Sequence, residues 1–161
     1  GHSERRIYNK ETNQHIQKCA ELAIKTNLKP IICVGENLSV RKNGKAINFI
    51  EKQIIECLPE KFEEIIIAYE PIWSIGTGKI PHKTEIKEMH TNITEIVNSK
   101  TQKKVKILYG GSVNENNIEE ILSVNNVGGV LVGGASLKIK DFLAIYSSAV
   151  KYLDKIHNIK D

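Results

Sequence analysis

Short runs of apolar, mostly β-branched residues recur along the chain and alternate with longer segments of helical period. The runs begin at Ile31, Ile65, Val105 and Gly129. Most are apolar throughout rather than alternating, which is typical of a parallel strand covered on both faces. The order strand, helix, strand, helix predicts a right-handed parallel α/β fold. Periodicity alone leaves open a partial barrel and a doubly wound sheet.

Five segments between and around these runs repeat apolar residues with the period of a helix. Their apolar faces are formed by Ile16, Cys19, Ala20 and Ala23; by Ala46, Phe49, Ile50, Gln53, Ile54 and Cys57; by Ile86, Met89, His90, Ile93, Ile96 and Val97; by Ile118, Ile121 and Leu122, with Asn114 as N-cap; and by Phe142, Leu143, Tyr146, Ala149, Val150 and Leu153. A length of 161 residues with 40% hydrophobic composition predicts one packed unit, residues 1–161.

Charge and composition exclude several classes of partner. The net charge is +4, but the lysines are spread over every predicted helix and only nine aromatic residues are present, which argues against a nucleic-acid surface. No apolar run is long enough to cross a bilayer and no leader opens the chain, so we expect a cytoplasmic protein without a membrane partner. Cys19, Cys33 and Cys57 show no metal-site spacing, and we interpret them as buried free thiols.

Chemically distinctive residues follow the predicted strands and precede the first helix. They form the segments Gly1–Arg6, Glu70–Lys79, Gly110–Val113 and Gly133–Leu137. In either fold the chemistry of a parallel sheet lies at the carboxyl ends of its strands, so these segments meet at one edge.

The glycine-rich turns predict an anion site. Glycine lets backbone N–H groups approach a ligand closely, and a helix N-terminus favours negative charge. Gly110-Gly111 and Gly133-Gly134 follow neighbouring strands, where a phosphate site recurs in barrels, and Gly76 lies on a third loop. The alternative for a single pair of glycines is a tight turn without a ligand. Neither loop has the spacing of a nucleotide-binding fingerprint.

Glu70 is the candidate general base. It stands at a strand terminus between Tyr69 and Pro71, where partial desolvation favours its taking a proton. The alternative is an ordinary surface glutamate. Trp73 and Ile75 argue against that alternative, because apolar residues on a loop with two glycines are typical of a lid that excludes water from a ligand.

His2 precedes the helix-starting residues Ser3 and Glu4. The positive end of a helix macrodipole disfavours an imidazolium, so we expect a neutral ring that donates a hydrogen bond. Among the other histidines, His90 lies beside an apolar stripe and is expected to be packed.

With these residues in view, the chain resembles the triosephosphate isomerase family over essentially its whole length. The motifs that carry the resemblance are Gly1–Arg6, Cys33–Glu36, Tyr69–Lys79, Tyr109–Val113 and Leu131–Leu137. The resemblance implies the last four to five βα units of a (β/α)8 TIM barrel with parallel strands. It also implies interconversion of dihydroxyacetone phosphate and D-glyceraldehyde 3-phosphate through an enediolate, with no metal and no cofactor.

The resemblance also assigns roles to individual residues. Glu70 would move the carbon-bound proton and neutral His2 would polarise the carbonyl, whereas Ser3 and Glu4 would support the site. Backbone groups of four residues would hold the phosphate of the triose: Gly76, Ser112, Gly133 and Gly134.

One departure from the family is serious. The Asn-x-Lys segment, whose lysine contacts the phosphate, has no counterpart here, and neither do the first three strands, most of the fourth and the loop that builds the family's homodimer interface. We therefore expect an isomerase represented by its C-terminal part, and we expect this chain alone to be inactive. Two alternatives remain: a truncated, non-catalytic phosphate-binding half-barrel, and a different phosphate-handling barrel enzyme, which the Glu70–Lys79 segment disfavours.

Overall fold

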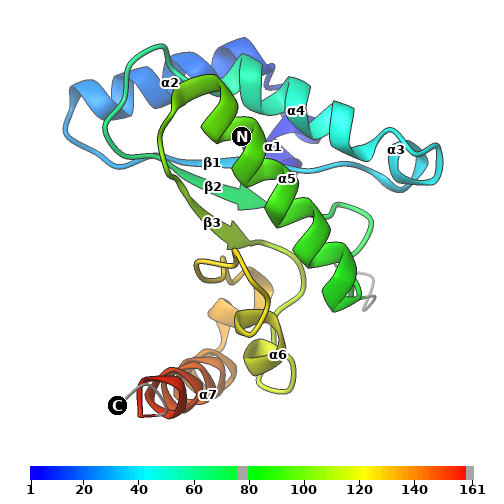
Figure 1. The fold of residues 1–161 in the computed structure, drawn as a ribbon, viewed down its shortest axis with the longest axis vertical. Coiled ribbons are helices and arrows are strands. Elements are labelled where there is room, and N and C mark those ends of the chain that lie inside the picture. The colour runs from blue at the N-terminus through cyan, green and yellow to red at the C-terminus, as the bar shows by residue number, and fades with distance from the viewer. Residues whose placement is uncertain (76–79, 159–161) are drawn as a thin grey trace.

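The computed structural model describes residues 1–75 and 80–158. At its centre the described residues form a three-stranded parallel sheet in the order β1-β2-β3 (Figure 1). The strands are β1 (Ile31–Val34), β2 (Ile66–Tyr69) and β3 (Lys106–Tyr109). Val34 pairs with Tyr69, and Tyr69 pairs with Tyr109. The three strands therefore end in register, and the residues that follow them meet at one edge, as predicted.

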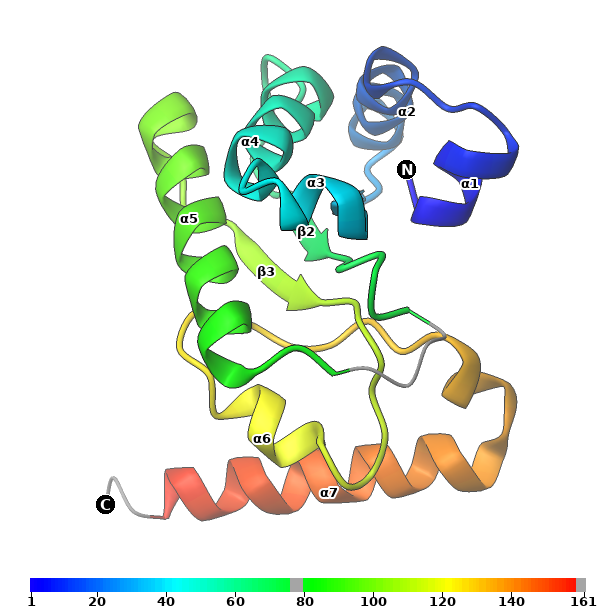
Figure 2. The ribbon, with the colours of Figure 1, turned by 90° about the vertical axis from the view of Figure 1, so that its right-hand side faces the viewer.

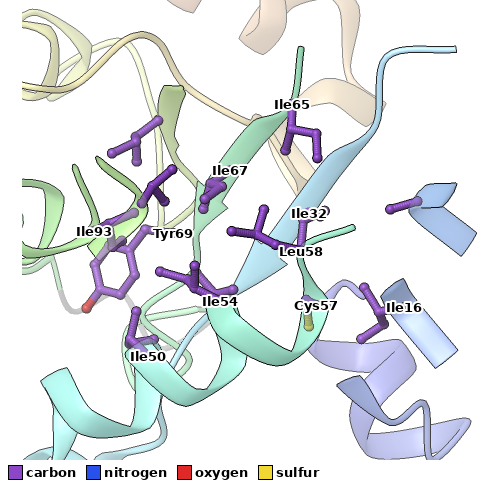
Figure 3. Packing of buried hydrophobic residues seen from close by; sticks show 14 of the residues in the cluster. Ile16, Ile32, Ile50, Ile54, Cys57, Leu58, Ile65, Ile67, Tyr69 and Ile93 are labelled. Atoms are coloured by element: carbon purple, nitrogen blue, oxygen red, sulfur yellow. The ribbon is translucent and has the colours of Figure 1, made fainter. Parts of the chain in front are cut away.

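Three helices cover one face of this sheet and lie side by side in Figure 2: α2 (Asn13–Lys25), α4 (Ala46–Cys57) and α5 (Lys83–Thr101). Their apolar stripes pack onto alternate residues of the strands, and Figure 3 shows Ile54 and Ile93 beside Ile67 in this core. All three of these side chains are at most 1% exposed. Two short helices precede α2 and α4 respectively: α1 (Ser3–Tyr8) and α3 (Leu38–Lys42).

The opposite face of the sheet is buried at only one end. Side chains alternate between the two faces of a strand, so Cys33, Ala68 and Glu70 share the face turned away from the helices. All three are buried. At the other end of the same face Ile31 is 44% exposed and Lys106 is exposed. In a closed barrel this face lines the interior, so the described chain builds the barrel wall without the strands that would face it.

The predicted fourth strand, Gly129–Val132, is reduced to an isolated parallel bridge between Tyr109 and Val130. Tyr109 donates to the Gly129 carbonyl and accepts from the Leu131 amide, at 3.0 and 2.8 Å. The run therefore follows the edge of β3, but it has no described strand on its other side. Val130 forms an isolated bridge rather than part of a ladder, so the prediction of a full strand was wrong here.

Beyond β3 the chain forms α6 (Ile118–Leu122), the 3₁₀ turn η1 (Gly134–Leu137) and α7 (Ile139–His157). The N-cap of α6 is Asn117 rather than the predicted Asn114. The Asn114 side chain instead accepts from the Asn116 amide at 2.9 Å, which closes a turn before the helix. The predicted helix is confirmed, but it starts one turn later than an N-cap at Asn114 implies.

Two predictions of burial were wrong. Cys19 is exposed, because the buried stripe of α2 runs through Ile16 and Ala20 instead. On α7 the predicted apolar face is largely exposed: Phe142 is 43%, Leu143 53% and Tyr146 60% accessible. Figures 1 and 2 show the reason, since α7 lies beside α6 and apart from the α2–α4–α5 layer.

Candidate active site

Glu70 and His2 meet at the carboxyl edge of the sheet. Glu70 Oε1 lies 3.0 Å from Nε2 of His2, and Glu70 Oε2 accepts the backbone N–H of Ser3 at 2.9 Å. Glu70 is 2% exposed, whereas the His2 side chain is 44% exposed. A buried carboxylate thus faces a half-exposed imidazole, although the two residues are 68 positions apart in the chain.

Glycine allows the close approaches that set the position of Glu70. The Glu70 amide donates to the Val34 carbonyl at 2.7 Å, which continues the β1–β2 pairing past the end of the strand. A Cβ on Gly35 would lie only 1.8 Å from the Glu70 carbonyl oxygen, and a Cβ on Gly110 would lie 3.0 Å from Glu70 Cγ. Side chains at these two positions would therefore displace the glutamate.

The surroundings of Glu70 favour a carboxyl that is ready to accept a proton. Burial raises its pKa above the usual value of 4.5, and the Ser3 backbone hydrogen bond, His2 and Cys33 lower it by less. The Cys33 thiol is neutral, since burial and the adjacent Glu70 charge raise its pKa to about 12. Desolvation therefore dominates, as expected for a general base at a strand end.

The hydrogen bonds of His2 define its tautomer. His2 is the N-cap of α1, and its Nδ1 accepts from the Glu4 amide at 3.4 Å. A nitrogen that accepts a hydrogen bond carries no proton, so a neutral ring places its proton on Nε2, which faces Glu70. The Glu4 side chain is exposed, and Glu4 reaches the site through its backbone N–H.

A cavity of about 410 Å³ opens beside this pair. Besides His2 and Glu70, its lining consists of Ile75, Gly110, Gly111, Ser112, Val113, Leu131, Val132, Gly133, Gly134 and Ala135. A Cβ on Gly133 or Gly134 would meet no atom within 4 Å, so both backbones border open space that a ligand can enter. The structure thus brings Ser112, Gly133 and Gly134 together with His2 and Glu70. Gly76, the fourth predicted phosphate contact, lies outside the described residues.

Two residues beside the site received no role from the sequence, Glu36 and Arg41. Glu36 is fully buried, and its Oε1 accepts from Tyr69 Oη at 3.1 Å and from Trp73 Nε1 at 2.9 Å. Arg41 pairs with the same oxygen at 3.0 Å and lies 4.7 Å from the centre of the Trp73 ring. Glu36 carries the signal that identified Glu70, a carboxylate just after an apolar strand, and could have been found by it. Arg41 carries no such signal.

These contacts attach the start of the predicted lid, Trp73 to Ile75, to the sheet. Ser112 Oγ adds a second attachment by donating to the Ser74 carbonyl at 3.2 Å. The glycine part of the predicted lid, Gly76–Lys79, lies outside the described residues. Residues 1–75 and 80–158 contain no group of three or more His, Cys, Asp or Glu placed to hold a metal ion. No helix in the described part of the chain is long and apolar enough to span a bilayer.

Fold and site together define a portion of a parallel α/β barrel, with a carboxylate–imidazole pair and glycine-rich loops at the carboxyl ends of its strands. Comparison with known proteins gives the same class. The family model described as triosephosphate isomerase matches residues 1–149. The chain therefore belongs to the triosephosphate isomerase family, and the resemblance seen in its motifs is confirmed.

Individual relatives agree. The chain is 45% identical to the triosephosphate isomerase of Hyphomonas neptunium over 156 residues, which cover 94% of this chain and 63% of the relative. It is 47% identical to that of Caulobacter vibrioides over 150 residues, or 90% and 59% of the two chains. The crystal structure of triosephosphate isomerase from Bartonella henselae superposes with a TM-score of 0.84 at 37% identity, covering 92% of this chain and 62% of that one. The chain thus spans about three-fifths of the length of these relatives.

Proposed function

We propose that this chain forms the C-terminal part of an isomerase that interconverts dihydroxyacetone phosphate and D-glyceraldehyde 3-phosphate. The observation that carries the proposal is the buried Glu70 carboxylate, held 3.0 Å from His2 Nε2 at the wall of a cavity whose other wall is built by glycine loops. A desolvated base, a neutral hydrogen-bond donor and an anion cradle are the three elements that proton transfer next to a phosphate-bearing carbonyl requires.

The geometry supports a division of roles. Glu70 removes a proton from one carbon of the triose and returns it to the neighbouring carbon. The Nε2–H of His2 donates to the carbonyl oxygen, where negative charge develops in the enediolate. In the structure the two groups contact each other, so a substrate that enters between them takes over the His2 hydrogen bond. Backbone N–H groups near Ser112, Gly133 and Gly134 receive the phosphate.

A non-catalytic phosphate-binding half-barrel is the second candidate. It is favoured by the cavity lining, which contains no lysine or arginine among the described residues. Without a cation the enediolate and the phosphate lack a positive partner, although the glycine loops still offer N–H donors.

We also propose a cytoplasmic location, which the three free thiols support. The family resemblance also implies a homodimer. Light scattering measures the molar mass in solution and tests this implication in a protein whose barrel is completed by the N-terminal portion of a relative.

The test of isomerase activity requires a completed barrel. A hybrid in which the N-terminal portion of the Hyphomonas neptunium isomerase precedes residues 1–161 should interconvert the two trioses. In this hybrid, Glu70→Asp withdraws the carboxylate by one methylene, a displacement on the order of 1 Å that costs about a hundredfold in kcat. The exposed Glu119→Asp is the matched control.

Several results discriminate between the candidates. Equal kcat values for Glu70→Asp and Glu119→Asp would remove Glu70 from the mechanism. The acidic limb of kcat/KM should lie above pH 4.5, because the ionised base is required and burial raises its pKa. A hybrid that binds a two-carbon phosphonate but turns over neither triose would favour the half-barrel.

A further inference from the structure

The side chain of Arg6 connects the residue before His2 to the end of β1. Its Nε donates to the Gly1 carbonyl at 2.8 Å, and its Nη2 donates to the Cys33 carbonyl at 2.9 Å. Nη1 donates to Asn13 Oδ1 at 2.5 Å, and Nη2 also approaches Cys57 Sγ at 3.5 Å. One half-buried guanidinium thus joins four segments of the chain.

The partners of Arg6 are unusual because all of them are neutral. They are two backbone carbonyls, an amide and a thiol, and in the described residues no carboxylate pairs with this guanidinium. Arg5, on the same helix, differs, since its Nε donates to Glu11 Oε1 at 2.7 Å. Glu11 lies in the loop after the helix, and its side chain is 8% exposed. Arg5 therefore makes a local ion pair, whereas Arg6 uses the fixed fork of its donors to hold backbone in place.

Both carbonyls that Arg6 holds belong to residues next to His2 or next to Val34, which binds the Glu70 amide. Gly1 is directly followed by His2. Cys33 is directly followed by Val34, whose carbonyl accepts the Glu70 amide at 2.7 Å. A displacement of the guanidinium therefore moves the His2 backbone relative to that of Glu70. The gap that changes is the 3.0 Å between His2 Nε2 and Glu70 Oε1.

The helix that carries His2 has few other attachments. α1 is six residues long, and only Ser3 is buried in it. Figure 2 shows α1 beside the start of α2, at the margin of the helix layer. The Ser3–Glu70 hydrogen bond belongs to the site itself and must adapt when a substrate enters. Outside the site, the contacts of Arg6 with the Gly1 and Cys33 carbonyls attach the backbone next to His2 to β1.

We propose that Arg6 is the positioning residue that fixes His2 against Glu70 in the proposed isomerase reaction. Arg6 acts through backbone and touches no substrate. Because the phosphate loops at Ser112, Gly133 and Gly134 follow other strands, loss of Arg6 should misplace the carbonyl donor without disturbing phosphate binding. The inference rests on the proposed function, so the unmodified hybrid must first show isomerase activity. An inactive hybrid would contradict the proposed function, not the role of Arg6.

The test compares Arg6→Lys with Arg5→Lys in the barrel-completed hybrid. Lysine keeps the charge but cannot span the two carbonyls. We expect kcat to fall by about tenfold to a hundredfold in Arg6→Lys, with KM changed by less than about threefold. Arg5→Lys should match the parent. Titration with a two-carbon phosphonate should give the parent stoichiometry, which excludes an unfolded fraction, and the ¹⁵N signal of His2 Nε2 should shift in Arg6→Lys alone.

Two further variants keep the proposal open to refutation where Arg6→Lys does not fold. Guanidinium ion should partly restore kcat in Arg6→Ala, whereas urea at the same concentration should not. Asn13→Ala removes one of the four contacts and should lower kcat by a smaller factor at unchanged KM. A parent-like kcat in Arg6→Lys, or equal effects of both lysine variants on kcat and on the His2 signal, would overturn the proposal.

Discussion

Helices α4 and α7 carry the same kind of apolar stripe but reach opposite degrees of burial. On α4, Ile50, Ile54 and Cys57 are at most 1% exposed, because the stripe lies on β1 and against α5. On α7, Leu143 and Tyr146 remain 53% and 60% exposed, because α7 contacts α6 and η1 but none of the three strands closely. An amphipathic period therefore selects a face, and a neighbouring sheet is needed to bury it.

The same contrast applies to the active site. Glu70, His2 and Ser3 lie in the region of β1, β2 and α4, where paired strands and a dense core hold them. Gly133 and Gly134 lie in the region of α7, which follows the isolated bridge between Tyr109 and Val130. The proposed acid–base half of the site is thus better supported by packing than the half that we propose receives the phosphate.

The largest expected effect comes from completing the barrel. The chain alone should show no turnover and poor solubility, since unpaired sheet edges and an uncovered inner face favour association. Addition of a separately made N-terminal portion of the Hyphomonas neptunium isomerase should raise activity by about a hundredfold or more above the chain alone, because the family resemblance implies that this portion supplies a lysine at the phosphate. Hydrogen exchange should slow in α7 much more than in α4. Substantial turnover by the chain alone would refute this prediction.

Truncation of apolar side chains should distinguish the two regions by a smaller effect, measured in the free energy of unfolding. Ile93→Ala removes a fully buried side chain and should cost about 3 kcal/mol in the free energy of unfolding. Leu143→Ala should change the chain alone by less than about 0.5 kcal/mol, because its side chain is already half exposed. Urea unfolding at low protein concentration measures both. In the completed barrel the cost of Leu143→Ala should rise towards that of Ile93→Ala, and an unchanged cost would show that α7 finds no partner there.

The pH dependence of stability should report on a contact between the regions. His90 of α5 is fully buried, packs edge-on against Tyr69 and places Nδ1 3.1 Å from the carbonyl of Asn126 in the turn after α6. Burial lowers its pKa from 6.5 to about 4. The fold therefore favours the neutral ring, so stability is complete above pH 6.5 and is lost as the pH falls from 6.5 through 4.

Between pH 7.5 and pH 5 this linkage amounts to about 2 kcal/mol. Glu70 acts in the opposite direction, since its raised pKa makes ionisation unfavourable for the fold as the pH rises. The comparison of parent and His90→Gln isolates the histidine, because both retain Glu70. The variant should lose less stability than the parent over this range in urea titrations. Parallel curves would mean that His90 does not titrate between the two states.

Sequence reasoning succeeded where residues act through local pattern. The ends of parallel strands converge in register, so Glu70 after β2 and the glycines after β3 could be placed at one edge, and His2 at a helix start. It failed where burial depends on neighbours. The stripe of α7 and the run Gly129–Val132 have the pattern of buried elements, but this chain provides them with too few partners. Arg6 and Arg41 were missed because their contacts join residues that are distant in sequence.

The smallest expected effect lies at the junction of the two regions, at Asn117. Its side chain is buried, donates from Nδ2 to the Ser112 carbonyl at 3.0 Å and accepts the Asn114 amide at 2.8 Å. Asn117→Ala removes both hydrogen bonds and should cost about 1 kcal/mol in the completed barrel. The loop that carries Ser112 loosens, so the affinity for a phosphonate should fall by less than about tenfold while Glu70 and His2 keep their geometry.

Asn116→Ala is the matched control, because Asn116 is exposed and contributes its backbone N–H, not its side chain, to the turn. Urea unfolding and calorimetric titration with the phosphonate measure the two effects. If the acid–base half and the phosphate half of the site are held independently, Asn117→Ala raises KM and leaves kcat near that of Asn116→Ala. A fall in kcat at unchanged KM would instead show that the turn after β3 also sets the position of Glu70, through the close approach of Gly110 to its side chain. The two regions would then not contribute independently to catalysis.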